Sequence, residues 1–370
     1  MKTLAIIGST GSIGKAALGV YRKNKKKFNL VYLAANTNLK KLNLQNIKYK
    51  PKHIFLLNDK KKALHYYKKN FLNTQDALSP NQKKIDYIIS GVSSYDAISV
   101  NSKLIKIAKN LLIANKETII CGGSFFLNAA KKNNCKVIPI DSEHYCLDFF
   151  LNNFKSTNQI KKFYIVASGG PFFKRSIKKN YNISSVIKHP TWKMGAEISV
   201  NSSNFANKVL ELFEAKILFK IPFNKIRIRV EQTSNIHAVI KLKNNFYLPI
   251  MHKPRMEVPI SDALNVVHNY DINQKNFKFN LLIPDSNKFP LIKLGYKILA
   301  KYGHIGMVFF TVFNSRMVNL YLNKEIKYGD ISNSLVKAFE NKLVKNYLKK
   351  RIKNLKDVFE SISIAEKIKL

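Results

Sequence analysis

The chain has few acidic residues for its length and a large excess of basic ones. Its 370 residues include 64 lysines and arginines against 22 aspartates and glutamates, a formal net charge of +42. The lysines are scattered over the whole length, and no motif interleaves them with aromatic residues, so we expect no nucleic-acid partner. A positive field of this kind still attracts phosphorylated small molecules.

Cysteines and long apolar runs are also scarce. The three cysteines, Cys121, Cys135 and Cys146, are an odd number without Cys-x-x-Cys spacing, which suggests neither a disulfide framework nor a thiolate zinc site. We interpret Cys146 as a small core residue; the alternative is a nucleophile. No apolar run predicts a bilayer span, and the first residues already have the pattern of a strand. We therefore expect no targeting peptide, no membrane partner and a cytoplasmic location.

The first 140 residues alternate between apolar runs typical of strands and amphipathic stretches typical of helices. The expected strands are 3–8, 29–34, 53–57, 86–90, 110–114 and 136–140. The expected helices are 12–24, 39–44, 60–71, 95–108 and a short one after residue 114. This alternation predicts an α/β fold with a doubly wound, Rossmann-like parallel sheet.

Beyond residue 150 the pattern changes. Strands at 162–167, 226–230 and 236–250 predict a small mixed sheet, and the polar stretch 269–290 has the composition of a linker. Helical patterns follow at 291–301, 304–322, 330–347 and 349–368. We expect four segments: a nucleotide-binding domain over 1–148, an α+β catalytic domain over 149–268, the linker over 269–290, and a C-terminal helical bundle over 291–370.

A glycine-rich loop, Gly8-Ser9-Thr10-Gly11-Ser12-Ile13-Gly14, joins the first expected strand to the first helix. Glycines at this junction let a backbone approach a pyrophosphate at a helix N-terminus. The alternative is a plain tight turn. A strand before the loop and a helix after it favour dinucleotide binding.

The end of the second strand indicates which dinucleotide. NAD sites usually place an acid there, bonded to the ribose 2′-hydroxyl. Here the stretch is Asn36-Thr37-Asn38, residues 1–58 contain no Asp or Glu, and Lys40 and Lys41 follow. With no acid to repel a 2′-phosphate, the sequence favours NADP.

Asp141-Ser142-Glu143-His144 follows the apolar run that ends the sixth expected strand. In an extended chain Asp141 and Glu143 project on the same side, and two adjacent carboxylates repel unless a cation lies between them. A hard divalent cation with a third oxygen ligand is one interpretation. The other is a helix start with Asp141 as cap and Glu143 as a first-turn acid.

Three polar stretches follow in the second half. Ser168 heads a glycine turn, and the only tryptophan, Trp192, lies in the loop from His189 to Gly195 as either a packing anchor or a lid. The third stretch, from Ser202, predicts a capped helix start whose Asn207, Lys208 and Glu211 share one face by their i,i+3 and i,i+4 spacing. That face is either a surface ion pair or a phosphate site beside a metal ligand.

Taken together, these stretches resemble the 1-deoxy-D-xylulose 5-phosphate reductoisomerase family, from about residue 3 to 330. The matching motifs, in order, are Gly8–Gly14, Ala114-Asn115-Lys116-Glu117, Asp141–His144, Ser168–Phe172, His189–Gly195, and Ser202 with Asn207-Lys208-x-x-Glu211. One such motif is weak, whereas six in order are specific.

The resemblance implies a homodimer that rearranges and reduces a phosphorylated ketose with NADPH and Mg²⁺ or Mn²⁺. It implies cofactor contacts from Thr10, Gly11, Ser12, Ile13, Asn36, Thr37, Asn38, Asn115, Glu117 and Gly195. The implied metal ligands are Asp141, Glu143 and Glu211. The implied substrate contacts are Lys116, Ser142, Ser168, His189, Ser202, Asn207 and Lys208, with Trp192 on a mobile lid.

The chain also departs from the family's pattern. The family usually has Gly then Lys or Arg where this chain has Asn36-Thr37. Its His-Pro-Gln-Ser, Pro-x-Met-Arg and Asn-x-x-Asn-Glu read here Glu231-Gln232-Thr233-Ser234, Pro254-Arg255-Met256-Glu257 and Thr311-Val312-Phe313-Asn314-Ser315. Because the expected metal and substrate contacts are retained, we favour a fast-evolving true enzyme. The alternatives are a paralogue that reduces another sugar phosphate with NAD(P)H, and a non-catalytic basic binding protein.

Overall fold

The computed structural model describes residues 1–58, 70–154, 157–176, 179–189, 191–192, 194–272 and 279–368. The chain divides into two compact units, each built from separate stretches of sequence. Unit 1 comprises Met1–Thr118, Phe126–Tyr145 and Met256–Asn269, and unit 2 comprises Ile119–Phe125, Cys146–Arg255 and Tyr270–Leu370. The helix expected at 60–71 lies outside the described residues except for its last two positions.

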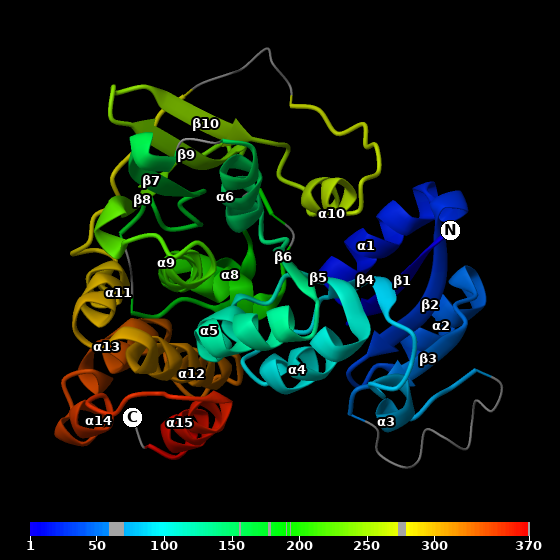
Figure 1. Cartoon of the computed structure of the whole chain (residues 1–370). Helices are drawn as coiled ribbons and strands as arrows, with labels where there is room; N and C mark the ends of the chain where they lie inside the picture. Colours follow the sequence, from blue (N-terminus) through cyan, green and yellow to red (C-terminus); the bar gives the residue numbers. More distant parts are fainter. Residues whose placement is uncertain are drawn as a thin grey trace. The chain divides into compact units, whose positions relative to one another are not determined.

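Unit 1 contains a six-stranded sheet in the order β3-β2-β1-β4-β5-β6, and every pair of neighbours is parallel. The strands are β1 (Lys2–Ile7), β2 (Phe28–Ala35), β3 (His53–Leu56), β4 (Ile85–Ser90), β5 (Ala108–Ile113) and β6 (Lys136–Pro139) (Figure 1). Leu4 to Ile7 are fully buried, as expected of a central strand covered on both faces. The α/β prediction is confirmed.

Helices carry the chain from each strand of this sheet to the next. They are α1 (Ser12–Lys23), α2 (Leu39–Tyr49), α3 (Thr74–Ala77), α4 (Ala97–Ile107) and α5 (Lys116–Lys132). The last is seventeen residues long, so the short helix expected after residue 114 is wrong. It kinks at Gly123, whose φ is 54°.

Unit 1 also includes a helix from much later in the chain. Ile260 of α10 (Glu257–Ala263) and Leu264 belong to the same hydrophobic cluster as Leu4 and Ile6 of β1. Residues 256–269 therefore pack with the first sheet, whereas we expected the catalytic domain to continue to residue 268. The sequence of α10 by itself does not indicate which of the two sheets the helix packs against.

Unit 2 contains a four-stranded mixed sheet in the order β10-β9-β7-β8. Its strands are β7 (Ile160–Ala167), β8 (Ile226–Val230), β9 (Ile236–Leu242) and β10 (Tyr247–Met251). The single strand expected at 236–250 is wrong: it is an antiparallel hairpin, turned at Asn245 with φ 67°. Leu282, in the expected linker, forms a β-bridge with Val230.

Unit 2 also contains helices, several of which pack against the long apolar α12. They are α7 (Ile183–Ile187), α8 (Ala196–Ser203), α9 (Ala206–Leu218), α11 (Pro290–Lys301), α12 (Gly303–Leu322), α13 (Tyr328–Ala338), α14 (Lys342–Tyr347) and α15 (Leu355–Lys367). The last two predicted helices are therefore divided and shortened, because Asn341 and Asn354 cap new helices with their side chains. A further helix, α6 (Ser142–Asn153), follows β6.

Among the described helices, α12 alone is long and apolar enough to cross a bilayer. Its most apolar window is 78% buried within the protein. Its neighbours include α8, α13 and α15. This is the environment of a core helix. The sequence analysis found no apolar run of bilayer length and so overlooked α12 as a helix of that length.

Candidate active site

The glycine-rich loop lies where the strand order reverses, between β1 and β4. Ligands of doubly wound sheets bind at this point. A Cβ at Gly8, whose φ is 80°, would lie 2.7 Å from the carbonyl oxygen of Gly91, and a Cβ at Gly14 would lie 2.4 Å from that of Gly8. The loop therefore requires glycine at both positions.

The start of α1 is open to an anion. No side chain caps the helix at Gly11, and its first turn contains no acid. Gln45 of α2 holds the loop through two hydrogen bonds: it accepts from the Ser9 hydroxyl at 2.6 Å and donates to the Ser9 carbonyl at 2.9 Å. Thr10 to Ile13 thus lie at an uncapped helix N-terminus, which suits a pyrophosphate.

Asn36, Thr37 and Asn38 follow β2 and are exposed. The Asn38 side chain caps α2 by accepting from the backbone N–H of Lys41 at 3.0 Å. Lys40 and Lys41 are exposed in the first turn of that helix. Their charges and the helix N-terminus together favour an anion here.

Asn115, Lys116 and Glu117 follow β5 and begin α5. The Asn115 side chain caps α5 by accepting from Thr118 N at 2.7 Å and donates to a Glu117 carboxylate oxygen at 2.8 Å. Burial raises the pKa of Glu117, while the neighbouring Lys116 ammonium opposes the shift. The cap fixes the direction in which the first turn presents Lys116.

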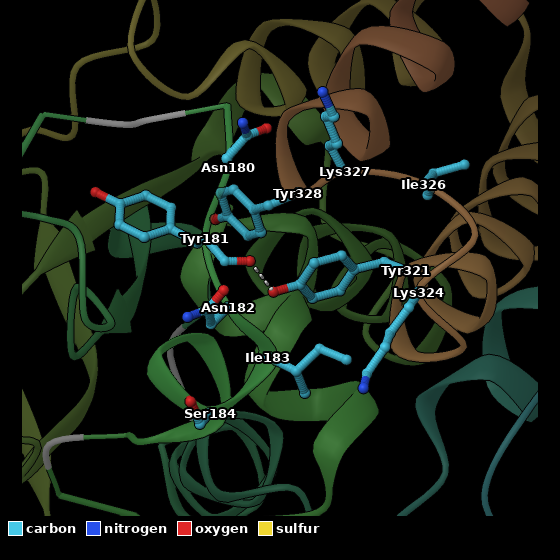
Figure 2. A pocket seen from close by; sticks show the side chains of 10 residues that line it. All are labelled: Asn180, Tyr181, Asn182, Ile183, Ser184, Tyr321, Lys324, Ile326, Lys327 and Tyr328. Atoms are coloured by element: carbon cyan, nitrogen blue, oxygen red, sulfur yellow. Dashed lines mark hydrogen bonds between the residues drawn. The ribbon is translucent and has the colours of Figure 1, made fainter.

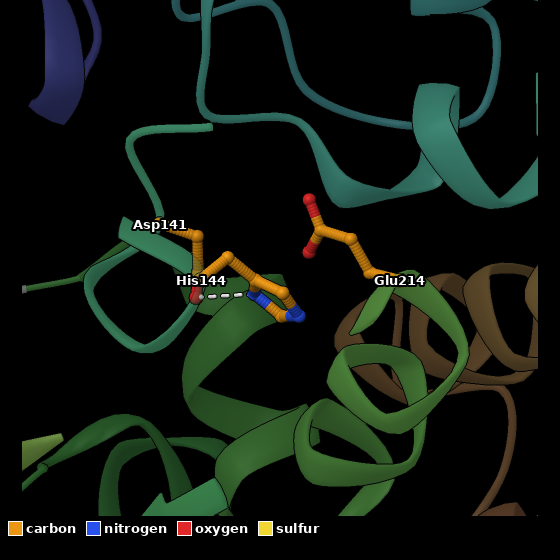
Figure 3. A group of neighbouring side chains, drawn as sticks. All are labelled: Asp141, His144 and Glu214. Carbon is orange, nitrogen blue, oxygen red and sulfur yellow. Dashed lines mark hydrogen bonds and ion pairs between the residues drawn. The ribbon is translucent and has the colours of Figure 1, made fainter. Parts of the chain in front are cut away.

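Asp141 lies between two buried partners. The Lys116 ammonium is 2.8 Å from one of its oxygens. The His144 Nδ1 is 3.1 Å from the other, a contact drawn as a dashed line in Figure 3. Burial would raise the pKa of Asp141, but Lys116 and His144 hold it well below its usual range. The carboxylate is therefore charged at neutral pH.

Glu143 joins Asp141 by a different route from the one expected. Because α6 begins at Ser142, the two acids do not alternate along a strand; they are brought together in a helix's first turn, with carboxylate oxygens within 4.8 Å. The Ser142 hydroxyl donates to Glu143 at 2.6 Å. The helix-start interpretation is thus correct for the backbone, and the helix start also brings the two carboxylates together.

The second group of expected residues lies in unit 2, where His189 organises two loops. Its Nδ1 accepts from the backbone N–H groups of Thr191 at 3.2 Å and Trp192 at 3.0 Å. The proton must then be on Nε2, which is 2.9 Å from the Ser168 hydroxyl oxygen. Burial, and secondarily Lys208, lowers the pKa of His189 to about 4.

The loop that carries Trp192 has further contacts within unit 2. The Thr191 and Ser234 hydroxyls are 2.8 Å apart, and the Trp192 ring meets the His237 ring edge-on at 6.1 Å. The Trp192 ring therefore packs against His237 of unit 2 in this structure. Pro190 and Lys193 of the same motif lie outside the described residues, and Gly195 caps the start of α8.

The expected helix start at 202–211 is two helices, because Phe205 takes a φ of 66° between α8 and α9. Ser202 lies near the end of α8, while Asn207, Lys208 and Glu211 share one face of α9 as predicted. Both Asn207 and Lys208 donate to Glu211, Lys208 at 2.7 Å. Lys208 is 7% exposed and Glu211 is fully buried, so this is not a surface ion pair.

Two buried residues were assigned no role from sequence. His144 lies at i+3 from Asp141, a spacing that could have indicated their contact. Glu214, 1% exposed, lies at i+3 from Glu211 on α9, and its carboxylate is drawn in Figure 3. An acid within the apolar run of α9 was the available signal.

A cavity of about 540 Å³ lies elsewhere in unit 2, between residues 180–184 and the α12–α13 connection (Figure 2). Within it the Tyr321 hydroxyl donates to the backbone oxygen of Tyr181 at 2.8 Å. None of the expected site residues lines it. The contact anchors the segment that leads to His189.

The site residues therefore form two groups, one in each unit. Unit 1 has a dinucleotide loop and a charged carboxylate pair with a buried lysine, and unit 2 has a buried Lys–Glu pair and a histidine-organised loop. An open parallel sheet with this loop, together with these acids, defines a dinucleotide-dependent oxidoreductase with a carboxylate-rich centre.

Comparison with known proteins gives the particular family. Models of the 1-deoxy-D-xylulose 5-phosphate reductoisomerase family match residues 4–123, and those of its C-terminal domains match 137–219 and 251–368. A 1-deoxy-D-xylulose 5-phosphate reductoisomerase from Pelagibacter ubique (strain HTCC1062) is 34% identical over 348 residues, 88% of each chain. The chain belongs to this family and is an enzyme of the NADP-dependent oxidoreductase class.

Solved structures agree. A 1-deoxy-D-xylulose 5-phosphate reductoisomerase from Zymomonas mobilis in complex with NADPH matches with a TM-score of 0.82 and 25% identity, covering 99% of this chain and 97% of that one. A DOX-P reductoisomerase in complex with NADPH, fosmidomycin and magnesium matches with a TM-score of 0.89, 24% identity and the same coverage. At that identity the second match supports the fold.

Proposed function

We propose that the chain converts 1-deoxy-D-xylulose 5-phosphate to 2-C-methyl-D-erythritol 4-phosphate, a step of non-mevalonate isoprenoid biosynthesis. It uses NADPH and Mg²⁺ or Mn²⁺. The observation that carries the proposal is the charged Asp141 beside Glu143 with buried Lys116 on its other side. Family membership and the relatives solved with NADPH and with magnesium support it.

The donor set fits a hard divalent cation. Asp141 and Glu143 offer carboxylate oxygens within 4.8 Å of each other, and Asp141 is charged because its pKa is low. With Glu211 as third ligand the set is all oxygen, which suits Mg²⁺ or Mn²⁺ and disfavours zinc. When bound, the ion would polarise the substrate carbonyl.

The nucleotide loop fits NADPH. Thr10 to Ile13 lie at an uncapped helix start, which suits a pyrophosphate, and Lys40 and Lys41 offer charge for a 2′-phosphate. Asn115, Glu117 and Gly195 are the further proposed contacts, beside Asn36, Thr37 and Asn38. The cofactor supplies the hydride, and the protein supplies its placement.

Residues of the chain itself position the sugar phosphate. Since Nε2 of neutral His189 donates to Ser168, the Ser168 hydroxyl proton remains to donate to a phosphate oxygen. Lys208, held by Glu211, adds a cation, and Ser202 and Asn207 add further donors. Lys116 and Ser142 would contact the oxygenated carbons, where Lys116 stabilises developing negative charge.

One departure from the family's pattern has a structural explanation. The Glu231 carboxylate accepts from the backbone N–H of Thr233 at 2.8 Å and from its hydroxyl at 2.7 Å. Glu231 is 3% exposed and therefore stabilises its own loop. It gives no support to a paralogue with a different substrate.

Assembly and location follow from the same proposal. We expect a homodimer, which light scattering on the purified chain tests. We also expect the cytoplasm, where small-molecule enzymes of this kind act, and the burial of α12 agrees with a core helix rather than an anchor.

Turnover tests the proposal directly. Purified chain, 1-deoxy-D-xylulose 5-phosphate, NADPH and Mn²⁺ should give NADPH oxidation that chelator abolishes. Oxidation with a different sugar phosphate alone would favour the paralogue. Salt-sensitive DNA binding without metal-dependent turnover would favour the basic binding protein.

A further inference from the structure

Two polar residues of the core helix α12 form hydrogen bonds to α8, one to the start of the helix and the other beside Ser202 near its end. The Ser315 hydroxyl donates to a Glu197 carboxylate oxygen at 2.9 Å. One residue earlier on α12, the Asn314 amide donates to the Asn201 side-chain oxygen at 2.9 Å. We propose that Ser315 and Asn314 are positioning residues for the phosphate-binding end of α8; the proposal rests on the proposed role of Ser202.

The helix geometry supports this role. Glu197 and Asn201 are four residues apart, so they lie on the same face of α8, toward α12. Ser202 is the next residue after Asn201 and is rotated by about 100° from it, which leaves its side chain outside the contact with α12. Both contacts therefore fix the rotation and the axial position of α8 without involving Ser202.

Burial makes the contacts specific. Asn314, Asn201 and Ser315 are 1%, 2% and 3% exposed. The Asn314 amide N–H and the Ser315 hydroxyl each have a partner on α8 that replaces the hydration lost on burial, whereas the Asn314 Oδ1 has no hydrogen-bond partner among the described residues. Sliding or rotating α8 by a fraction of a turn would break both matches. Apolar packing alone would distinguish less sharply between neighbouring rotations and axial positions of α8.

The Glu197–Ser315 contact also accounts for a departure in the sequence. Where the family's motif ends in Glu, this chain has Ser315, and its partner is an acid. A glutamate at 315 would place a second carboxylate against Glu197 at a buried position, where like charges repel strongly. The serine hydroxyl instead donates to Glu197. The pair can therefore be tested by exchanging charges.

The test is a double-mutant cycle in the full-length enzyme. Ser315→Glu should raise KM for 1-deoxy-D-xylulose 5-phosphate by about tenfold, since a small displacement of a binding group costs on the order of this much or more. NADPH affinity should change less than KM for the sugar phosphate, because every proposed cofactor contact except Gly195, at the start of α8, belongs to unit 1. Adding Glu197→Lys places opposite charges at the contact, so the double variant should recover most of the loss.

Thr311→Val is the matched control. Thr311 lies one turn earlier on α12, is 1% exposed, and donates to Met307 of its own helix at 2.8 Å rather than to α8. Its loss should leave KM within twofold of wild type. If Ser315→Glu does not fold, Ser315→Ala replaces it, with an expected rise in KM of about threefold. Asn314→Leu should act in the same direction as Ser315→Glu.

Hydrogen exchange of a peptide covering residues 196–204 gives a readout that does not depend on turnover. Ser315→Glu should accelerate exchange there at least about tenfold, and Glu197→Lys should reverse the change. Unchanged KM and unchanged exchange in an active enzyme would overturn the inference, as would a KM defect that Glu197→Lys does not relieve. An inactive wild type would overturn the proposed function, and exchange alone would then decide whether α12 fixes α8.

Discussion

The His189 ring should stay neutral well below neutral pH, with its proton on Nε2. Two backbone N–H groups point at Nδ1, and burial with nearby Lys208 lowers the pKa from 6.5 to about 4. At pH 5.5 about 3% of the rings would then be protonated, against about 91% for an unperturbed histidine. The difference is large enough to follow site by site.

The sign of the effect on stability follows from linkage. Between pH 6.5 and 4 the unfolded chain binds a proton at this site that the folded chain does not, so stability falls as pH falls. The ceiling is about 3 kcal/mol, and roughly half of that remains after allowance for the partial exposure of the ring. The stability contribution of neutral His189 should be lost completely only below the pKa of about 4 that the ring has in the folded chain.

Nuclear magnetic resonance of ¹⁵N-histidine-labelled protein tests this directly. The chain has eight histidines, and His189→Gln identifies the signal to follow. We expect a titration midpoint near pH 4 and the Nε2–H tautomer. Lys208→Gln should raise the midpoint but keep it below 6.5, because burial is the larger cause. A midpoint near 6.5, or an Nδ1–H ring, would refute the hydrogen-bond assignment and the role given to Ser168.

Three further substitutions have specific expected outcomes. Gly14→Ala places a Cβ 2.4 Å from the Gly8 oxygen and should reduce NADPH affinity, measured by fluorescence titration, at least about tenfold. In Gly19→Ala, on the same helix, the new Cβ meets no atom within 4 Å, so NADPH affinity should stay unchanged. Glu211→Gln keeps the size of the side chain but removes the negative charge opposite Lys208. Metal affinity measured by calorimetry should fall by about tenfold or more, while NADPH affinity stays unchanged. Glu340→Gln, at an exposed position, is the control. Unchanged metal affinity would remove Glu211 from the metal site. Replacing Lys40 and Lys41 by Ala should raise KM for NADPH about tenfold and for NADH little, in contrast to the same change at exposed Lys25 and Lys26; equal effects on both cofactors would exclude a 2′-phosphate contact.

Much of the fold could be predicted because local patterns determine it. The alternation of apolar strands with helices predicted the parallel sheet, and the glycine spacing predicted the loop at its switch point. The hairpin at β9 and β10 was missed although Asn244-Asn245 offered a turn signal. The packing of α10 on the first sheet could not be predicted, because contact between Ile260 and β1 depends on tertiary structure.

In the candidate site, too, local spacing could be predicted from the sequence whereas tertiary contacts could not. The shared face of Asn207, Lys208 and Glu211 follows from helical spacing, but its burial does not, since the same spacing is common on surfaces. The break at Phe205 depends on a left-handed residue that no propensity indicates for phenylalanine. Lys116 follows β5, a different strand from the β6 that precedes Asp141, so it could be placed beside Asp141 only by resemblance or by structure.

The measurement that tests the central claim most directly is NADPH oxidation by the purified chain in the presence of 1-deoxy-D-xylulose 5-phosphate and Mn²⁺. The variable is the addition of a chelator. We predict turnover with the metal, its loss on chelation, and its return when Mn²⁺ is restored. Product analysis should give 2-C-methyl-D-erythritol 4-phosphate. Absence of NADPH oxidation in a folded, metal-loaded protein, or oxidation that chelation does not affect, would contradict the assignment of Asp141, Glu143 and Glu211 as the metal-binding centre of a reductoisomerase.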